Sequence, residues 1–387
     1  MEKLSRRGFI GAVGAGVAAL AGRRAEAAGD EKALPTRPLG RTGVAVPVLG
    51  AGFDFDTAAS HVVLRRAVRR GIGWWDTAAT YANGNSEVGI GRYFKKFPDE
   101  RARVFLVTKS ERFDPADLEQ SLVRSLDRMR TDRVDLFMLH GVDSASQLEP
   151  PGIRRWAEQA KASGRIRLFG FSTHDAVPCL SAAAATTGFD VVLFQYNYRL
   201  REDRALSGAI DACAAAGIGL AGMKFRGLGP MGESAPSNAA PAAQRIPADG
   251  EKLKAALSDG RIACVLARMQ DVATLDAFAA AAADARLSGT VPRGLAEHAE
   301  ATRGEYCDGC RRCEPPAGVP VAAVMRSLMY LRAYGERDRA CATFASLPDG
   351  VEARVAACDS AALDGACPRG LPVGRLLREA CRDLGRA

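Results

Sequence analysis

Short apolar runs alternate with amphipathic segments along most of this chain. Val104 to Val107 and Val134 to Leu139 are two of the runs, and they are typical of buried strands. Val62 to Arg70, Asp117 to Arg130 and Arg154 to Ser163 place apolar residues at helical spacing with polar residues between them. The pattern therefore predicts strands and helices that follow one another in regular alternation.

Eight strand candidates follow a hairpin-like opening at Gly40 to Gly43. They end near Gly50, Trp75, Lys109, His140, Phe171, Gln195, Met223 and Leu266. A helical stretch separates each from the next, and Ala273 to Ala285 follows the last. This alternation predicts a (β/α)8 TIM barrel with active-site groups at the carboxyl ends of its strands. An open doubly wound sheet is the alternative, but no Gly-rich turn follows the first strand.

Two later regions break the alternation. Gly227 to Gly250 is rich in Pro, Ser, Ala and Gly without periodicity, which predicts a loop after the seventh strand. Beyond Val291 lies a separate region that holds most of the cysteines, where Ala317-Gly-Val-Pro-Val321 and Arg369-Gly-Leu-Pro-Val373 repeat one another, each before a helix. We therefore expect a barrel over residues 36–290 and a small α-rich, ferredoxin-like domain over residues 300–387.

The first residues predict a targeting segment rather than part of the fold. Ser5 to Ile10 contain paired arginines, a weakly apolar Gly- and Ala-rich run extends to Gly22, and Ala25 to Ala27 offer a cleavage site. We expect residues 1–28 to be a twin-arginine signal peptide that takes the chain through the twin-arginine translocase to the periplasm or another extracytoplasmic space. An uncleaved anchor and an ordinary Sec signal are the alternatives. The run is too short and glycine-rich for a stable transmembrane helix, which needs about 20 apolar residues.

Composition and charge restrict the possible partners but do not indicate a function. The chain has 387 residues, of which 47% are hydrophobic and 25% are charged, so it can bury a large core. Its net charge of +8 comes from basic residues scattered along the sequence, without a stripe of basic and aromatic residues. A solvated surface explains that charge, and we expect no nucleic-acid partner.

Four polar residues suggest one site at the rim of the barrel. Asp76, Lys109 and His140 each stand where a strand-like run stops, and Tyr81 lies in the loop after the first of them. A tyrosine titrates near about 10, so it donates a proton at neutral pH only if something favours its anion, and the Lys109 ammonium is the candidate. Asp76 would keep that buried lysine charged, and His140 would orient a substrate carbonyl. Together they predict a carbonyl-reducing site.

The motifs around these residues resemble those of the aldo-keto reductases. The resemblance is carried by D-T-A-x-x-Y from Asp76 to Tyr81, G-N-S-E from Gly84 to Glu87, V-T-K ending at Lys109, L-H ending at His140, Gly170-Phe-Ser172-Thr-His174-Asp and Phe194-Gln195-Tyr-Asn197-Tyr. The catalytic tetrad of that family maps onto Asp76, Tyr81, Lys109 and His140. The resemblance implies hydride transfer between a nicotinamide cofactor, NADP(H), and a small-molecule carbonyl substrate.

The same resemblance implies where the nicotinamide cofactor binds. Ser172 and Gln195 match the serine and glutamine that the family uses, and Met223 takes the place of its stacking aromatic residue. Leu266-Ala-Arg268-Met269 replaces the usual Pro-Gly turn near the phosphate, and Ala279 to Ala283 replaces the usual Glu-Asn, which leaves Arg268 as the candidate phosphate contact. These departures keep open a second hypothesis, an electron-transfer or ligand-binding protein on a barrel that has lost nicotinamide binding.

The strongest metal signal is a group of four cysteines. Cys307, Cys310 and Cys313 form a C-x-x-C-x-x-C run, and Cys367 precedes a proline in the second repeat. The group resembles the two-cluster ferredoxins, in which three closely spaced cysteines and the Cys-Pro cysteine of the other half bind one iron–sulfur cube. Structural zinc and disulfides are alternatives.

A second cube has lost its ligands. Pro315 and Pro316 stand where its cysteine in the first run is expected, and only Cys358 remains of the three in the second run. The resemblance thus implies a single [4Fe–4S] cluster on Cys307, Cys310, Cys313 and Cys367. A branch of the aldo-keto reductases combines such a C-terminal domain with the barrel. The cluster would be structural or would relay electrons to a redox partner protein.

Overall fold

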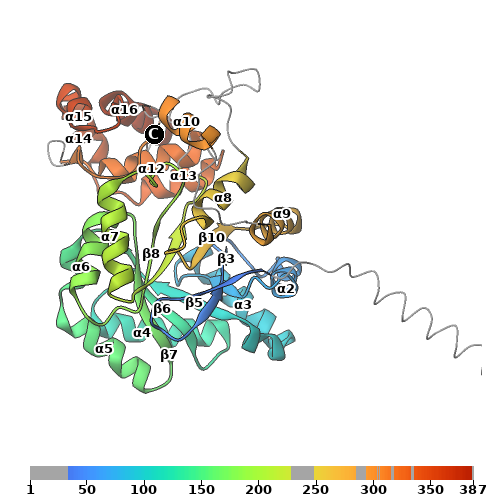
Figure 1. The fold of residues 1–387 in the computed structure, drawn as a ribbon. Coiled ribbons are helices and arrows are strands. Elements are labelled where there is room, and N and C mark those ends of the chain that lie inside the picture. Colours follow the sequence, from blue (N-terminus) through green and yellow to red (C-terminus); the bar gives the residue numbers. More distant parts are fainter. Residues whose placement is uncertain are drawn as a thin grey trace, which may run out of the picture. The chain divides into compact units, whose positions relative to one another are not determined.

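The structure is a computed structural model that describes residues 34–227, 248–284, 293–302, 304, 306–314, 318–332 and 335–385. The expected signal peptide, residues 1–28, and most of the loop expected over residues 227–250 lie outside the described residues. The described chain begins with a short hairpin, continues as a barrel and ends in a group of helices (Figure 1).

Eight parallel strands close into a barrel in the order β10-β3-β4-β5-β6-β7-β8-β9. They are β3 (Leu49–Gly52), β4 (Trp74–Asp76), β5 (Phe105–Ser110), β6 (Val134–Val142), β7 (Ile166–Thr173), β8 (Val191–Gln195), β9 (Gly219–Met223) and β10 (Cys264–Arg268). Each strand coincides with one of the apolar runs in the sequence. The (β/α)8 TIM barrel is therefore confirmed, and the doubly wound alternative is wrong because β10 pairs with β3 and closes the sheet.

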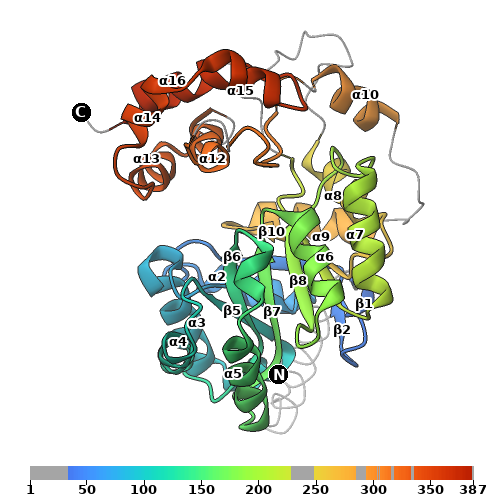
Figure 2. The ribbon, with the colours of Figure 1, turned by 90° about the vertical axis from the view of Figure 1, so that its left-hand side faces the viewer.

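Helices surround the strands, as Figure 2 shows. They are α2 (His61–Arg69), α3 (Asn85–Lys96), α4 (Pro115–Met129), α5 (Pro151–Ala162), α6 (Ala176–Ala185), α7 (Arg204–Ala215), α8 (Asp249–Leu257) and α9 (Val272–Ala283), with 3-10 turns η1 (Tyr81–Gly84), η2 (Pro98–Arg103) and η3 (Ala145–Leu148). α4 illustrates their design: Asp114 caps it by accepting a hydrogen bond from Ala116 N at 2.9 Å, and Leu118, Leu122 and Met129 form its buried face. Such faces pack on the outside of the barrel and form the main hydrophobic core.

The predicted hairpin is confirmed and closes the amino end of the barrel. β1 (Thr36–Pro38) and β2 (Ala45–Pro47) pair antiparallel. Leu39 and Val46 are fully buried in the cluster of side chains that fills the barrel interior. Gly40 has a φ of +54°, and a Cβ there would lie 2.4 Å from the carbonyl oxygen of Gly217, so the turn requires glycine. The opposite, carboxyl end is thereby left for the active site.

The described residues after Arg293 form helices and include no strand. The helices are α10 (Arg293–Ala301), α12 (Val321–Arg332), α13 (Arg337–Ala345), α14 (Val351–Ala357), α15 (Ser360–Ala366) and α16 (Val373–Leu384). α12 and α16 begin at the final valines of the two repeats, pack against each other and share a second apolar core. The expected helices after each repeat are therefore confirmed, while the ferredoxin-like relationship stays a prediction.

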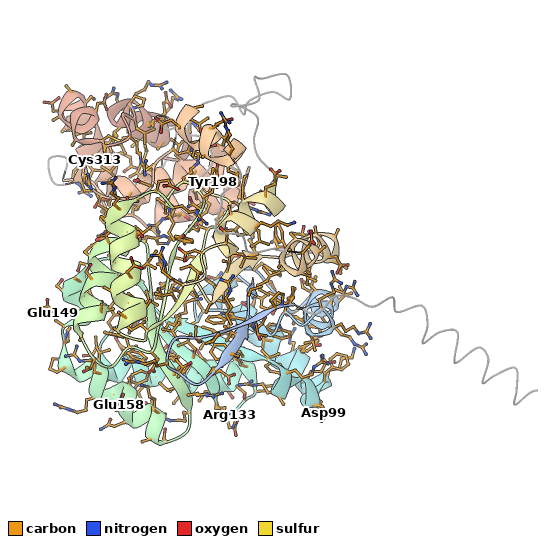
Figure 3. All side chains as sticks on the ribbon, in the orientation of Figure 1. Asp99, Arg133, Glu149, Glu158, Tyr198 and Cys313 are labelled. Atoms are coloured by element: carbon orange, nitrogen blue, oxygen red, sulfur yellow. The ribbon has the colours of Figure 1, made fainter. Side chains whose placement is uncertain are left out.

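Contacts join the C-terminal helices to the barrel. Tyr198, in the segment after β8, packs with Leu295 of α10, and Figure 3 labels Tyr198 on the side of the barrel that faces the C-terminal helices. Arg199 places its guanidinium carbon 3.3 Å from the ring centre of Tyr306. Among the described residues, no helix is both long enough and apolar enough to cross a membrane.

Candidate active site

The site is built from the last inward-facing side chains of the barrel strands. Side chains alternate along a strand, so Trp74 and Asp76 share one face of β4, as Val107 and Lys109 share one face of β5. Trp74 and Val107 belong to the apolar interior, and Asp76 and Lys109 lie one step closer to the carboxyl rim. The same spacing holds for His140, Ser172, Gln195, Met223 and Arg268 on their own strands. Strand parity thus delivers all these predicted residues to one rim.

Asp76 and Lys109 form a buried ion pair. Lys109 Nζ donates to Asp76 Oδ1 at 2.5 Å and to the carbonyl oxygen of Thr77 at 2.8 Å, and the two side chains are 1% and 4% exposed. Burial raises the pKa of Asp76, and the nearby ammonium acts in the opposite direction. Asp76 Oδ2 is buried and has no hydrogen-bond partner among the described residues. The expected pairing of the two groups is present.

The G-N-S-E motif holds the loop that carries Tyr81. Ser86 Oγ donates to the carbonyl oxygen of Phe53 at 2.6 Å, and Thr108 Oγ1 donates to Glu87 Oε1 at 2.6 Å. Arg128 joins the two parts, since its Nη1 donates to Glu87 Oε2 at 3.1 Å and to the carbonyl oxygen of Ala79 at 3.0 Å. These hydrogen bonds therefore hold the loop that carries Tyr81 in place.

Gly84 is required where the loop turns into α3. Its φ is +89°, and a Cβ there would meet the Arg128 guanidinium at 2.6 Å. The two residues before it, Ala82 and Asn83, also have positive φ values of 48° and 54°. The loop therefore takes an uncommon backbone path directly after Tyr81, and the Arg128 contacts fix it.

Tyr81 lies against both Lys109 and His140. Lys109 Nζ is 4.8 Å from the centre of the Tyr81 ring, and the rings of Tyr81 and His140 lie 5.4 Å apart at an interplanar angle of 83°. The tetrad that the sequence predicts is therefore brought together in space.

The electrostatics of Tyr81 differ from the sequence-based expectation. Burial raises the pKa of Tyr81 well above 10, the carboxylates of Asp76 and Asp54 raise it further, and Arg339 lowers it. We had expected Lys109 to lower this pKa, but its charge is offset by Asp76 at 2.5 Å. The phenol consequently keeps its proton at neutral pH, which is the form that a proton donor needs.

His140 is held at an irregularity in β6. The pairing of β6 with β7 shifts between Leu139 and Val142, and Gly141 N donates to Ser172 Oγ at 3.0 Å. His140 Nδ1 lies 3.3 Å from Glu111 Oε1. Burial lowers the pKa of His140, although Glu111 acts to raise it. The imidazole is therefore neutral at pH 7 and suited to hydrogen bonding with an uncharged carbonyl.

A cavity of about 1060 Å³ opens over these residues, larger than most small-molecule sites. It is bordered by all four tetrad residues and by Ser172, Met223 and Arg268. Gln195 is 5% exposed and borders two neighbouring hollows instead, one of them together with His174 and Cys307. The structure thus brings three of the four expected cofactor residues to the main cavity.

Arg268 is already engaged by carboxylates. Its Nε donates to Asp54 Oδ1 at 2.6 Å, and its Nη1 contacts Glu336 Oε1. Arg339 also bridges these two acids, with Nη2 at 2.9 Å from Asp54 Oδ2 and Nη1 at 3.0 Å from Glu336 Oε2. Two of the three guanidinium nitrogens of Arg268 are therefore already used by carboxylates.

Sequence reasoning missed the part of the site that comes from the C-terminal helices. Arg326 and Tyr330 of α12, Glu336 just before α13, and Arg339 of α13 all border the cavity. Figure 1 shows α12 and α13 lying over the strands, and Figure 2 shows the same arrangement from the side. No motif in the sequence marks these residues, because their contacts join segments far apart along the chain.

The four predicted cluster cysteines border one small hollow beside the first turns of α12. Cys307, Cys310, Cys313 and Cys367 all line it, with Met325 beside them. Among the described residues, no three side chains of the types His, Cys, Asp and Glu are close enough together to hold a metal ion. All four cysteines are present as free thiols.

Comparisons with known proteins agree with this geometry. The sequence profile of the Aldo/keto reductase family matches residues 49–276. The chain is 28% identical over 201 residues to the aldo-keto reductase yakc [NADP(+)] of Schizosaccharomyces pombe, covering 46% of this chain and 57% of that protein. It is 27% identical over 210 residues to the uncharacterized oxidoreductase YrpG of Bacillus subtilis, covering 47% and 63%.

Solved structures give the same fold. The holo form of an aldo-keto reductase from Bacillus halodurans superposes with a TM-score of 0.57 at 19% identity, covering 72% of this chain and 99% of that one. The matches to curated relatives span little more than half of the relatives' own length, 57% and 63% in the two cases above.

Proposed function

On the premise that this chain belongs to the aldo/keto reductase family, we propose that it transfers hydride between a nicotinamide cofactor and a carbonyl or alcohol substrate. The observation that carries the proposal is the meeting of Tyr81, His140 and the Lys109–Asp76 pair at one cavity. Each group has a chemical part in carbonyl reduction.

The protein's own residues would supply the proton. As the carbonyl carbon accepts a hydride, its oxygen gains negative charge and takes the proton from the Tyr81 hydroxyl. His140 orients that oxygen beside Tyr81, the Lys109–Asp76 pair holds the Tyr81 ring in place, and the Arg339 guanidinium favours the phenolate that remains. NADPH, when bound, would supply the hydride. Ser172 and Met223 border the cavity and would hold the nicotinamide end, with Gln195 nearby.

Titration of the anaerobically purified, full-length protein with NADPH and NADH tests the proposal. We expect saturable binding of NADPH, followed by its oxidation when an aromatic aldehyde is added, measured by nucleotide fluorescence and absorbance. The carboxylates that occupy Arg268 motivate the alternative of an electron-transfer or ligand-binding protein on a reductase barrel. If neither nucleotide binds at millimolar concentration, the reductase proposal fails and the alternative stands.

We further propose that Cys307, Cys310, Cys313 and Cys367 bind one [4Fe–4S] cluster. The C-x-x-C-x-x-C spacing, the Cys-Pro step and the shared hollow support the proposal. Binding would require the thiols to turn toward the hollow, because the present side-chain positions do not form a metal-ligating group among the described residues. Cys307 also borders the hollow that contains Gln195, so a cluster there would lie beside the barrel mouth, structural or as a relay to a redox partner.

Cysteine variants separate this proposal from an adventitious metal. Cys310→Ala should remove most of the iron and acid-labile sulfide from anaerobically purified protein, because it takes away one of the four proposed thiolate ligands. Cys358→Ala is the matched control, since this thiol donates to the carbonyl oxygen of Val355 at 3.0 Å and does not border the hollow. Equal loss of iron in both variants, or zinc in place of iron, would contradict the ligand assignment.

Export is proposed as well. The paired arginines Arg6 and Arg7, the weakly apolar run and the small residues near Ala27 support a twin-arginine signal over residues 1–28. The translocase would be a partner, and the site of action would be the periplasm or another extracytoplasmic space. Cell fractionation of the R6K/R7K variant tests this, and an unchanged distribution would argue against it.

A further inference from the structure

Two of the cationic side chains that border the cavity have no carboxylate partner among the described residues. Six cationic side chains border it: Lys109, Lys224, Arg226, Arg268, Arg326 and Arg339. Four of them have carboxylate partners, namely Asp76 for Lys109, Asp249 for Arg226, and Asp54 and Glu336 for the other two. Within the described ranges, Lys224 and Arg326 form no ion pair.

Tyr330 fixes one of these two cations. Lys224 Nζ donates to Tyr330 Oη at 3.3 Å, and Arg339 Nη2 donates to the same oxygen at 3.2 Å. Burial raises the pKa of Tyr330, but Lys224, Arg339 and Arg326 together bring it below its ordinary value. Lys224 itself has a φ of +58°, a conformation that costs a non-glycine residue energy. The ammonium is thus held at the cavity by contacts within the protein.

Arg326 lies next to this group on the same helix. It is four residues before Tyr330 on α12, so the two side chains share one face of that helix. Arg326, Lys224 and His174 border the main cavity, and they also border the smaller hollow beside it. The two cations without carboxylate partners therefore lie on one wall of the site.

Residues of this wall influence the pKa values of groups in the active site. Burial lowers the pKa of His174 well below its usual range, and the charges of Arg326 and Lys224 lower it further. His174 therefore stays neutral and adds no competing charge. Tyr330 in turn contributes to the raised pKa of Tyr81. Tyr81 and His140 border the same cavity, so a molecule bound there can contact both the tetrad and this wall.

We infer that Lys224 and Arg326 form an anion-binding subsite that holds a carboxylate of the carbonyl substrate, with Tyr330 positioning Lys224. The inference rests on the proposed function, and it specifies an oxo acid or a carboxylated aldehyde as the substrate class. A guanidinium binds a carboxylate through two parallel hydrogen bonds, and an ammonium adds a third contact. In a partly water-excluded cavity such contacts are stronger than at an open surface. Arg326 lies outside residues 49–276, the range that the family profile covers.

A matched pair of aldehydes tests the subsite with NADPH and the full-length protein. 4-Carboxybenzaldehyde carries the anion, and methyl 4-formylbenzoate differs from it by neutralisation of that group. We expect Arg326→Gln to lower kcat/KM for the carboxylate by roughly 10- to 100-fold and to leave the ester within a factor of about 3. Lys224→Gln should act in the same direction, and Tyr330→Phe should raise KM for the carboxylate more than it lowers kcat.

Arg167→Gln provides the control. Arg167 is an exposed arginine near the opposite, amino end of β7, and its replacement should leave kcat/KM unchanged for both aldehydes. The inference is overturned if Arg326→Gln lowers kcat/KM equally for both aldehydes. It is also overturned if the variant weakens NADPH binding while the ratio of the two kcat/KM values stays constant, because the cations would then bind the nucleotide.

Binding of benzoate separates this inference from the proposed function. Isothermal titration calorimetry of the wild-type protein with benzoate measures binding of the carboxylate without any hydride transfer. Binding that is lost in Arg326→Gln supports the subsite even if neither aldehyde is reduced, in which case the reductase proposal alone fails. Benzoate binding that is unchanged in Arg326→Gln and Lys224→Gln overturns the subsite, whatever the activity.

Discussion

Replacing Tyr81 with phenylalanine should lower kcat for aldehyde reduction by roughly 10²- to 10⁴-fold, the usual contribution of a positioned general acid. The change removes one oxygen atom and keeps the ring against Lys109 and His140. NADPH binding should therefore stay the same within a factor of about 2, and KM for the aldehyde should change little. Steady-state kinetics and a fluorescence titration with NADPH measure the two effects separately.

Tyr93→Phe is the matched control for this experiment. Tyr93 is a fully buried tyrosine of α3 whose hydroxyl contacts Glu100, and it does not border the cavity. Its replacement should leave kcat near the wild-type value. Activity of Tyr81→Phe within a factor of about 10 of wild type would assign the proton to another group and contradict the proposed mechanism.

The barrel half of this site could be predicted because its information is local. Each strand is a short apolar run, and the polar residues that end the runs at Asp76, Lys109 and His140 mark the carboxyl rim directly. Strand parity then decides which side chains point inward, and Ser172, Met223 and Arg268 follow the same rule. The periodicity of the sequence and the ends of the strands are thus sufficient to predict which residues lie at the rim.

Contacts between distant segments could not be predicted in the same way. Arg268 looked available for a phosphate, but Asp54 and Glu336 occupy it in the folded chain. Gln195 has the inward parity that the motif requires, yet it borders the hollows next to Cys307 rather than the main cavity. The Glu336 contact and the hollows beside Gln195 depend on how the segments after Arg293 lie on the barrel, and no periodic pattern encodes that arrangement.

The expected electrostatics of Tyr81 failed for a related reason. Sequence reasoning treated Lys109 as a free positive charge beside a phenol. In the folded chain that charge is paired with Asp76, and the cation that lowers the pKa of Tyr81 comes from Arg339 of α13. The C-terminal helices therefore contribute to the active site electrostatically as well as by enclosing it.

Breaking the Asp76–Lys109 pair should give the largest loss of stability in the barrel. Asp76→Asn leaves the Lys109 ammonium buried without a carboxylate, and such a loss costs about 3–5 kcal/mol of the free energy of unfolding. Lys109→Met should be destabilising as well, because it leaves the Asp76 carboxyl group buried without its ammonium partner. Urea unfolding followed by tryptophan fluorescence measures both, since Trp74, Trp75 and Trp156 all lie in the barrel.

The pH dependence distinguishes the two variants. In Lys109→Met, burial keeps the pKa of Asp76 above its unfolded value, so the folded state binds more protons than the unfolded state. Stability of this variant should therefore rise as the pH falls through the folded-state pKa of Asp76, whereas Asp76→Asn has no carboxyl group at this position and should show no such recovery on acidification. The double variant D76N/K109M carries neither charge and should lose less than the sum of the two single losses. Strictly additive losses would mean that the pair does not interact as its 2.5 Å separation requires.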